Sequence, residues 1–313
     1  MSNRRTIAVV SCAYNEEACV AELVRRLRRL ASVEPSYSFR FILVDNGSTD
    51  STWERFYKET SGDANFELLK LSRNFGTDGG LSAGMSVVTS DACVLMAADL
   101  QDPPEMVSQL LRHWEAGYEN IYMVVQSRPD SSRARRILSQ VFYYVLDRMT
   151  EGLVPRNVSD FRLVDRKVYL AVREMPESSQ FLRGNFAWVG FKSIGVPGIR
   201  PDRHDGTSKA SFKAVSRLAR VGIVSFSDLP LRLITWIAIV SSALTLCLFT
   251  ANVVLKLLLG APKGFATLIS ILLLGFSGVS LILAVIAQYV AVLLAEAKSR
   301  PRFLISDRVT QHD

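Results

Sequence analysis

The stretch Ala92–Pro104, which reads ACVLMAADLQDPP, decides the fold class of this chain. Its first six residues are apolar, which predicts a buried strand over 92–97. The two prolines that close the stretch cannot donate ladder hydrogen bonds, so the strand must end before them. Asp99 and Gln101 alternate along the chain and converge only if the strand ends there. A strand end at this point would bring together two oxygen donors for Mg²⁺ or Mn²⁺.

An alternative interpretation of the same stretch involves no metal. The acidic residues would then form an ordinary strand-to-helix turn, with Asp102 capping a helix that starts at Glu105. The stretch by itself leaves both interpretations open.

Outward from this stretch, short apolar runs alternate with amphipathic helical patterns. The strands are expected at 6–11, 39–44, 66–71, 92–97 and 121–126, and the helices at 17–30, 51–60, 79–88 and 105–116. This order is typical of an α/β fold with a mostly parallel sheet and helices on both faces. Ligands bind such sheets beyond the carboxyl ends of the strands.

Polar loops follow the first four predicted strands. They cover residues 13–17, 45–50, 72–76 and 99–104. Each loop alone is ordinary turn chemistry, and Asn15 alone could be a helix N-cap. Four such loops on one edge of one sheet indicate a binding site. Because no Gly-x-Gly-x-x-Gly or Walker motif is present, Rossmann dehydrogenases and P-loop NTPases are excluded.

Two long apolar runs follow residue 230. Leu231–Leu255 and Leu268–Leu294 contain no Asp or Glu, and each exceeds the roughly 20 helical residues that cross a hydrocarbon core. The short turn at 260–264 joins them, so we expect a transmembrane hairpin with both flanks on one side. Basic residues in the flanks place these and the N-terminal region in the cytoplasm. Two buried core helices are the alternative, which such long unbroken runs disfavour.

The chain has 313 residues, of which 37 are basic and 30 acidic, for a net charge of +7. Together with two predicted spans, this excess indicates anionic membrane lipid and no nucleic acid as a partner. The four cysteines show no paired spacing, which indicates small buried side chains in a reducing compartment. Their spacing predicts no thiolate metal site.

Five ordered motifs resemble those of the family 2 glycosyltransferases with the GT-A fold, and in particular the polyprenyl-phosphate glycosyltransferases. The motifs are YNEE at 14–17, VDNGSTD at 44–50, RNFG at 73–76, DLQDPP at 99–104 and SDFRL at 159–163. The chain departs from the family at Asn46, where a second Asp is more common, and at Ala97, where some members carry another Asp.

The resemblance implies an α/β fold of the GT-A, or nucleotide-diphospho-sugar transferase, type. It implies a cytosolic catalytic domain at 1–205, a juxtamembrane amphipathic helix at 206–230, transmembrane helices at 231–259 and 265–296, and a cytosolic basic tail at 297–313. The protein would then be a multi-pass protein of the bacterial inner membrane.

The same resemblance implies the site residues. Mg²⁺ or Mn²⁺ would be held by Asp99 and Gln101, and Asp160 would be the catalytic carboxylate. The nucleotide sugar would be bound by Tyr14, Asn15, Glu16, Asp45, Asn74, Asp78 and Asp99. The lipid phosphate would be bound by Arg128, Arg133, Arg136, Arg203 and Lys209. A structural carboxylate paired with Arg162 is the alternative for Asp160, and its role as base or positioning group stays open.

The implied reaction is the metal-dependent, inverting transfer of one sugar from a nucleotide sugar to a polyprenyl phosphate. Glucose, a UDP-sugar and undecaprenyl phosphate are the expected sugar, donor and acceptor, and a homotetramer is plausible by resemblance alone. A catalytically silent, membrane-anchored nucleotide-sugar binder and a processive polysaccharide synthase are the alternatives.

Overall fold

The computed structural model describes residues 4–126, 158–175, 181–200 and 301–310, together with scattered positions between 236 and 297. The chain divides into two compact units. The first consists of Met1–Ala219 with Pro301–Asp313, and the second of Arg220–Arg300.

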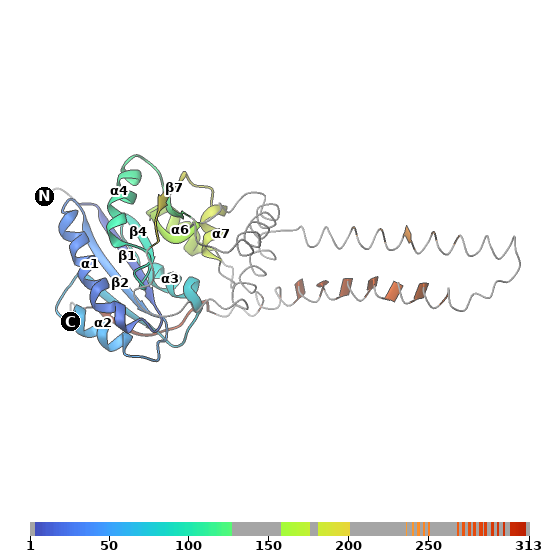
Figure 1. Ribbon diagram of the computed structural model, residues 1–313, viewed down its shortest axis with the longest axis horizontal. Coiled ribbons are helices and arrows are strands. Elements are labelled where there is room, and N and C mark those ends of the chain that lie inside the picture. Colours follow the sequence, from blue (N-terminus) through green and yellow to red (C-terminus); the bar gives the residue numbers. More distant parts are fainter. Residues whose placement is uncertain are drawn as a thin grey trace, which may run out of the picture. The chain divides into compact units, whose positions relative to one another are not determined.

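One eight-stranded sheet organises the described part of the first unit (Figure 1). Its strands are β1 (Thr6–Ala13), β2 (Ser38–Asp45), β3 (Phe66–Leu71), β4 (Ala92–Ala97), β5 (Asn120–Val125), β6 (Val158–Asp165), β7 (Ser193–Gly198) and β8 (Ile305–Thr310). The order across the sheet is β7-β5-β6-β4-β1-β2-β3-β8. β6 and β8 run against the direction of the other six strands.

Helices cover both faces of this sheet. One face carries α1 (Val20–Val33), α2 (Thr52–Thr60) and α4 (Val107–Glu115), and the other α3 (Gly76–Ser86), α6 (Arg166–Glu174) and α7 (Leu182–Trp188). Short 3-10 turns at Glu17–Cys19 and Pro104–Met106 precede α1 and α4.

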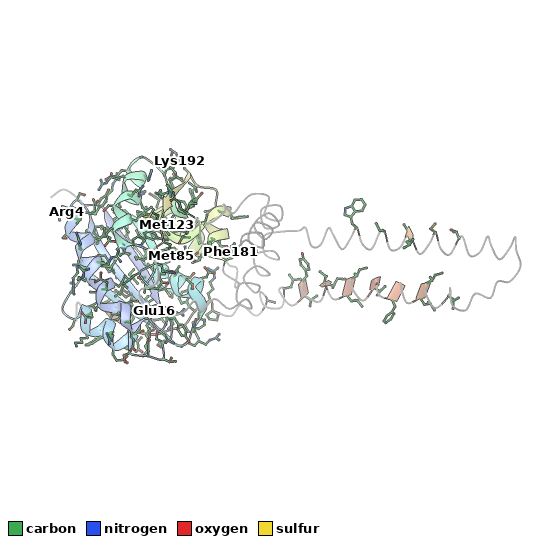
Figure 2. The ribbon with its side chains drawn as sticks, viewed as in Figure 1. Arg4, Glu16, Met85, Met123, Phe181 and Lys192 are labelled. Carbon is green, nitrogen blue, oxygen red and sulfur yellow. The ribbon has the colours of Figure 1, made fainter. Side chains whose placement is uncertain are left out.

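The central strands are apolar at successive positions because each face lies under helices. In β1, Val9 packs into the cluster beneath α1 and α4, while Val10 packs into the cluster beneath α3. Figure 2 shows Met123 and Met85 inside the fold, and these two side chains belong to the clusters on opposite faces.

The five strands and four helices expected from the sequence are confirmed, with ends that differ by a few residues. The first helix starts as a 3-10 turn, and the third starts at Gly76 instead of residue 79. Three strands were not predicted. β6 places Asp160 and Arg162 among apolar residues, β7 contains Gly and Pro, and β8 is mostly polar, so none shows a clear strand pattern.

The segment after residue 300, expected as a basic tail, contributes the edge strand β8. It pairs antiparallel with β3, from Ile305 opposite Leu71 to Thr310 opposite Glu67. The Ser72 N–H donates to the Leu304 carbonyl at 2.9 Å, just beyond the end of β3. The chain therefore enters β8 at the edge of the sheet where β3 ends.

The two predicted transmembrane helices, at 231–259 and 265–296, lie almost entirely outside the described residues. Within the described part of the chain, we find no helix with the length and apolar character needed to cross a membrane.

Helix α3 lies unusually close to the sheet because two of its glycines face β1. A Cβ atom at Gly80 would stand 2.2 Å from the Cys12 Sγ, and one at Gly84 would stand 2.2 Å from the Val10 Cγ1. The absence of side chains at these positions sets the distance between α3 and the strands that carry the site.

The substitution Gly84→Ala is expected to lower the free energy of unfolding by ~1–3 kcal/mol. An added methyl group would overlap Val10 and press on Val44 at 3.0 Å, so helix or strand must shift. Urea unfolding of the full-length protein, followed by tryptophan fluorescence, measures the change. Thr77→Ala on the exposed surface of α3 is the control. A stabilised Gly84→Ala protein, as helix propensity alone would give, contradicts the packing argument.

Candidate functional site

The loops after β1, β2, β3 and β4 meet at one edge of the sheet, as the sequence predicted. β1 pairs in parallel with both β2 and β4, with Ala13 opposite Asp45 and Cys12 opposite Ala97. The strand ends are therefore level, and the polar residues that follow them are neighbours. Among the described non-glycine residues, positive φ angles occur at Asn15 (54°) and Leu100 (61°), both on this edge.

The first loop is bonded to the second through backbone and side-chain groups. The Asn15 N–H donates to the Ser48 Oγ at 2.9 Å, and the Asn15 Oδ1 accepts from the Thr49 N–H at 2.8 Å. The Glu16 N–H donates to the Thr52 Oγ1 at 3.0 Å. The alternative of Asn15 as a helix N-cap is wrong, because Glu16 precedes the 3-10 turn and the Asn15 amide binds the neighbouring loop.

Asp45, at the end of β2, is fully buried. Its Oδ1 accepts from the Ser48 N–H at 3.0 Å, whereas its Oδ2 has no hydrogen-bond partner among the described residues. Burial raises the pKa of the Asp45 carboxyl, and the hydrogen bonds from Ser48 oppose that shift only in part. A buried carboxylate oxygen without a donor is costly, which makes Asp45 one of the unfavourable features of this edge.

The Asn46 side chain joins the second loop to the third through hydrogen bonds. Its Nδ2 donates to the Gly76 carbonyl at 2.9 Å and to the Asn74 Oδ1 at 3.3 Å, and its Oδ1 accepts from the Phe75 N–H at 3.0 Å. An aspartate could not make the two donations. At this position, where a second Asp is more common in the family, the Asn46 amide thus fixes the loop that carries Asn74.

Asp99 and Gln101 flank the strained residue Leu100. β4 ends at Ala97, as the prolines predicted, and the Asp99 Oδ1 accepts from the Gln101 N–H at 3.2 Å. A left-handed backbone conformation costs a residue such as Leu100 ~1–3 kcal/mol. Because the Leu100 side chain is buried, its packing can hold the backbone in this conformation. Outliers of this kind gather at functional sites.

The donor set of Asp99 and Gln101 fits a Mg²⁺ or Mn²⁺ ion whose remaining ligands come from a substrate and water. Such ions often take only one or two protein ligands together with phosphate oxygens. No group of three His, Cys, Asp or Glu residues that could enclose a metal occurs in the described ranges. The metal role of these residues stays a prediction.

Asp102 does not cap the turn that follows it. The turn after it is capped by Pro103 without a side-chain hydrogen bond. The buried Asp102 carboxylate instead accepts from Arg200, with Nη2 to Oδ1 at 2.9 Å, and from the Ala97 N–H at 3.0 Å. Burial raises the pKa of Asp102, and the Arg200 charge limits that rise.

Asp160, on β6, is paired with Arg183 of α7. The Arg183 Nε and Nη2 donate to the two carboxylate oxygens of Asp160, each at 2.6 Å. Burial works against ionisation, but Arg183, Arg162 and Arg200 outweigh it and leave the pKa of Asp160 below its ordinary value. The predicted alternative of a pair with Arg162 therefore named the wrong arginine.

Arg162 is buried on the same strand and held by other groups. Its Nη2 donates to the Ser159 carbonyl at 3.2 Å, and its guanidinium lies over the Phe186 ring at 4.6 Å. Burial lowers the pKa of Arg162 to about 10, although Asp160 opposes the shift.

Asp78, in the first turn of α3, joins the same cluster. Burial, and after it the charge of the neighbouring Asp160, raises the pKa of Asp78 to about 7. The charges of Arg183 and Arg162 and a hydrogen bond from the Leu182 backbone act in the opposite direction. α3, β6 and α7 thus bring two carboxylates and two arginines together.

The predicted lipid-phosphate residues Arg128, Arg133, Arg136, Arg203 and Lys209 lie outside the described residues. Tyr14 is half-buried in the first loop, and its nucleotide-sugar role stays a prediction. Sequence reasoning missed Arg183 and Arg200. The segment QFLRG at 180–184 was the only signal for Arg183, because ion pairs between distant segments leave no local pattern.

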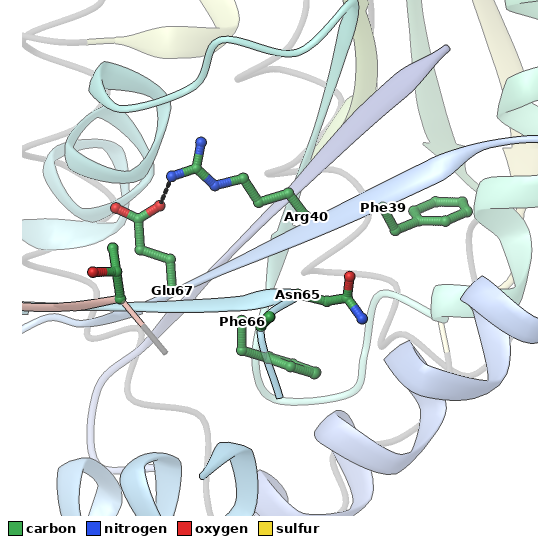
Figure 3. A pocket seen from close by; sticks show the side chains of 7 residues that line it. Phe39, Arg40, Asn65, Phe66 and Glu67 are labelled. Atoms are coloured by element: carbon green, nitrogen blue, oxygen red, sulfur yellow. Dashed lines mark hydrogen bonds and ion pairs between the residues drawn. The ribbon is translucent and has the colours of Figure 1, made fainter. Parts of the chain in front are cut away.

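A cavity of about 330 Å³ lies at the opposite edge of the sheet, lined by residues from the starts of β2 and β3 and the end of β8 (Figure 3). Arg40 and Glu67 form an ion pair across it. The cavity lies away from the carboxyl ends of the parallel strands, and none of the predicted site residues lines it.

Comparison with known proteins identifies the family. Residues 8–172 match the model of the glycosyl transferase family 2 domain. The chain belongs to glycosyl transferase family 2. It is therefore a glycosyltransferase, and the matched residues include β1 to β4 with their four loops and Asp160.

Relatives of this glycosyltransferase match it over nearly its whole length. An uncharacterised glycosyltransferase from Synechocystis is 36% identical, with 96% of this chain and 95% of the relative covered. A bactoprenol glucosyl transferase from Shigella phage SfX is 32% identical, with 96% and 99% covered. The prophage bactoprenol glucosyl transferase homologue of Escherichia coli is 31% identical, with 96% and 98% covered.

Solved structures establish that the glycosyltransferase has the GT-A type of α/β fold. Glucosyl-3-phosphoglycerate synthase from Mycobacterium tuberculosis, crystallised with Mn²⁺ and UDP, superposes with a TM-score of 0.53 at 18% identity. The match covers 70% of this chain and 78% of that chain. The same enzyme crystallised with Mg²⁺ and UDP gives a TM-score of 0.52 at 18% identity, covering 70% and 77%.

The raised pKa of Asp78 predicts a pH dependence of stability. The folded chain retains a proton that the unfolded chain releases between the ordinary pKa of 3.8 and about 7. The free energy of unfolding contributed by Asp78 therefore falls as pH rises through this interval. Asp78→Asn removes the dependence, so its stability relative to wild type should grow with pH and level off above about 7.

Urea unfolding of both proteins at several pH values between 4 and 8.5 measures this difference. Asp307→Asn, which changes an exposed carboxylate on β8, is the control. Parallel stability profiles for wild type and Asp78→Asn would contradict the prediction.

Proposed function

We propose that this glycosyltransferase transfers a single glucose from UDP-glucose to undecaprenyl phosphate, with inversion at the anomeric carbon, at the cytoplasmic face of a bacterial inner membrane. The observation that carries the proposal is the extent of the similarity. Bactoprenol glucosyl transferases match 96% of this chain, whereas the solved GT-A structures match about 70%. The relatives therefore share the C-terminal apolar segment as well as the catalytic domain.

The donor side of the proposal rests on the loops after β2 and β4. Asp45, whose buried Oδ2 has no hydrogen-bond partner among the described residues, would contact the nucleoside once the adjoining loops adjust to the donor. Tyr14, Asn15 and Glu16 lie in the loop bonded to the residues that follow Asp45. Asp99 and Gln101 would hold Mg²⁺ or Mn²⁺, which offsets the charge of a diphosphate leaving group.

The acceptor side rests on how the C-terminal third joins the sheet. β7 ends at Gly198 and β8 begins at Ile305 on the same edge that carries the candidate site. The chain thus leaves β7 and re-enters at β8 on the edge that carries the candidate site.

Several described helical positions of that segment carry large apolar side chains that are exposed, at spacings of three and four residues within each run. They include Trp236, Val240, Leu244, Leu268, Leu272, Phe276, Val279, Leu283, Ile286, Val290 and Leu293. Exposed apolar side chains at this spacing are suited to contact with lipid. They support the proposed hairpin of transmembrane helices.

Asp160 would act on the acceptor as a charged positioning group. A phosphate monoester has a second pKa of about 6 and is mostly dianionic at neutral pH, so it needs little deprotonation. The lowered pKa of Asp160 makes this carboxylate a weak base but keeps it ionised. One displacement by the phosphate oxygen at the anomeric carbon inverts the configuration.

The proposal is tested by incubating the purified protein with radiolabelled UDP-glucose, Mn²⁺ and undecaprenyl phosphate in detergent. Label should enter the organic phase as a lipid that carries one sugar. If the label stays in the aqueous phase with every common nucleotide sugar, a catalytically silent nucleotide-sugar binder is favoured. A labelled polymer would favour a processive polysaccharide synthase.

Asp99→Ala is expected to reduce turnover at least roughly 100-fold, since it removes a carboxylate that would hold the metal beside the leaving group. Initial rates of glucosyl-lipid formation and calorimetric titration with UDP and Mn²⁺ measure the effect. Asp307→Ala is the control, because this exposed residue lies on β8. Unchanged metal-dependent UDP binding in Asp99→Ala would remove the residue from the metal site.

Asp160→Asn is expected to lower kcat by roughly 10²–10⁴-fold, while KM for UDP-glucose changes by less than about threefold. The amide keeps the shape of the side chain but loses the charge that holds Arg183, through which Asp160 would position the acceptor. Steady-state kinetics with varied donor give both constants. Normal turnover in Asp160→Asn would mean that the carboxylate plays no part in the transfer.

A further inference from the structure

Arg183 lies between two carboxylates that come from different parts of the chain. Both its Nε and its Nη2 donate to Asp160 of β6, and the charge of Asp78 in α3 is close enough to act on it. The residue before it, Leu182, is hydrogen-bonded to Asp78 through the backbone. The Arg183 guanidinium is therefore held by Asp160 of β6, with the Asp78 carboxyl of α3 close by.

The two arginines of this cluster differ in accessibility. Arg162 is 2% exposed and is held between the Ser159 carbonyl and the Phe186 ring. The side chain of Arg183 is 32% exposed, and that of its partner Asp160 is 19% exposed. Of these two cations, Arg183 is the one that a substrate can reach.

An acceptor phosphate needs such a cation. A dianionic phosphate that approaches the ionised Asp160 is repelled unless a positive group lies between the two anions. Arginine presents a planar fork that binds carboxylate and phosphate in the same bidentate manner. The raised pKa of Asp78 keeps this carboxyl partly protonated at neutral pH, which leaves the cluster with a net positive charge for part of the time.

We infer that Arg183 binds the phosphate of the lipid acceptor, and that Asp160 is a competing ligand that holds the guanidinium in place until the acceptor arrives. This inference rests on the proposed function and adds a phosphate-binding residue to the site. It makes Arg183 a substrate contact in addition to its pairing with Asp160.

Competition for one guanidinium has two opposite consequences. Removal of Arg183 weakens acceptor binding, because the phosphate loses a charged hydrogen-bond donor. Removal of the Asp160 charge strengthens acceptor binding, because the guanidinium no longer has to be shared. A purely structural ion pair would not give the second effect.

The test uses the full-length protein in detergent, with undecaprenyl phosphate varied at saturating UDP-glucose and then the reverse. Arg183→Gln should raise KM for undecaprenyl phosphate roughly tenfold or more, with little change in KM for UDP-glucose. Arg183→Lys, which keeps the charge but loses the fork, should lie between wild type and Arg183→Gln. Arg25→Gln is the control, since Arg25 is an exposed arginine paired with Glu22 on α1.

A binding measurement completes the test without relying on turnover. Asp160→Asn should bind undecaprenyl phosphate several-fold more tightly than wild type when titrated in the absence of donor. The Asp160→Asn titration still tests the inference if the Arg183→Gln protein fails to fold.

The outcomes separate the inference from the proposed function. If wild type makes no glucosyl lipid, the proposed function fails. If wild type is active but Arg183→Gln lowers only kcat, Arg183 merely orients Asp160 and the inference is overturned. Weaker or unchanged lipid binding by Asp160→Asn overturns it as well.

Discussion

The parallel pairing of β1 with β2 on one side and β4 on the other is the constraint on which the site depends. This pairing aligns Ala13 with Asp45 and Cys12 with Ala97, so three loops begin at the same level. Polar residues that follow strand ends 32 and 85 positions apart in the chain then become neighbours. The hydrogen bonds of Asn15 and Asn46 fix the loops that this register has already brought together.

The same edge concentrates the features that cost free energy. Leu100 has a left-handed backbone, Asp45 leaves a buried oxygen without a donor, and Asp78 shares a small volume with Asp160. A single substitution could remove each of these unfavourable features if stability of the fold were the only requirement on the sequence. The apolar layers on both faces of the sheet hold these residues in place, which is the usual relation between a rigid scaffold and a strained site.

Local pattern and motif resemblance predicted the strands from β1 to β5, the edge that carries the site and the family. These depend on residues close together in sequence: the apolar run at 92–97, the prolines after it and the polar loops. β6, the Asp160–Arg183 pair and the Asp102–Arg200 pair were not predicted in this form. They depend on segments that meet only in the folded chain, and the polar residues of β6 hide its strand pattern. The Asn46 amide shows the same limit, since its partners lie about 30 residues away.

The position of β8 has a consequence for the order in which the protein is made. β3 pairs with a segment that the ribosome adds more than 230 residues later, after the apolar runs at 231–255 and 268–294. Until then β3 is an open edge whose backbone groups are available to other chains. During biosynthesis the catalytic sheet therefore stays vulnerable to misassociation until both apolar runs and the β8 segment have been synthesised.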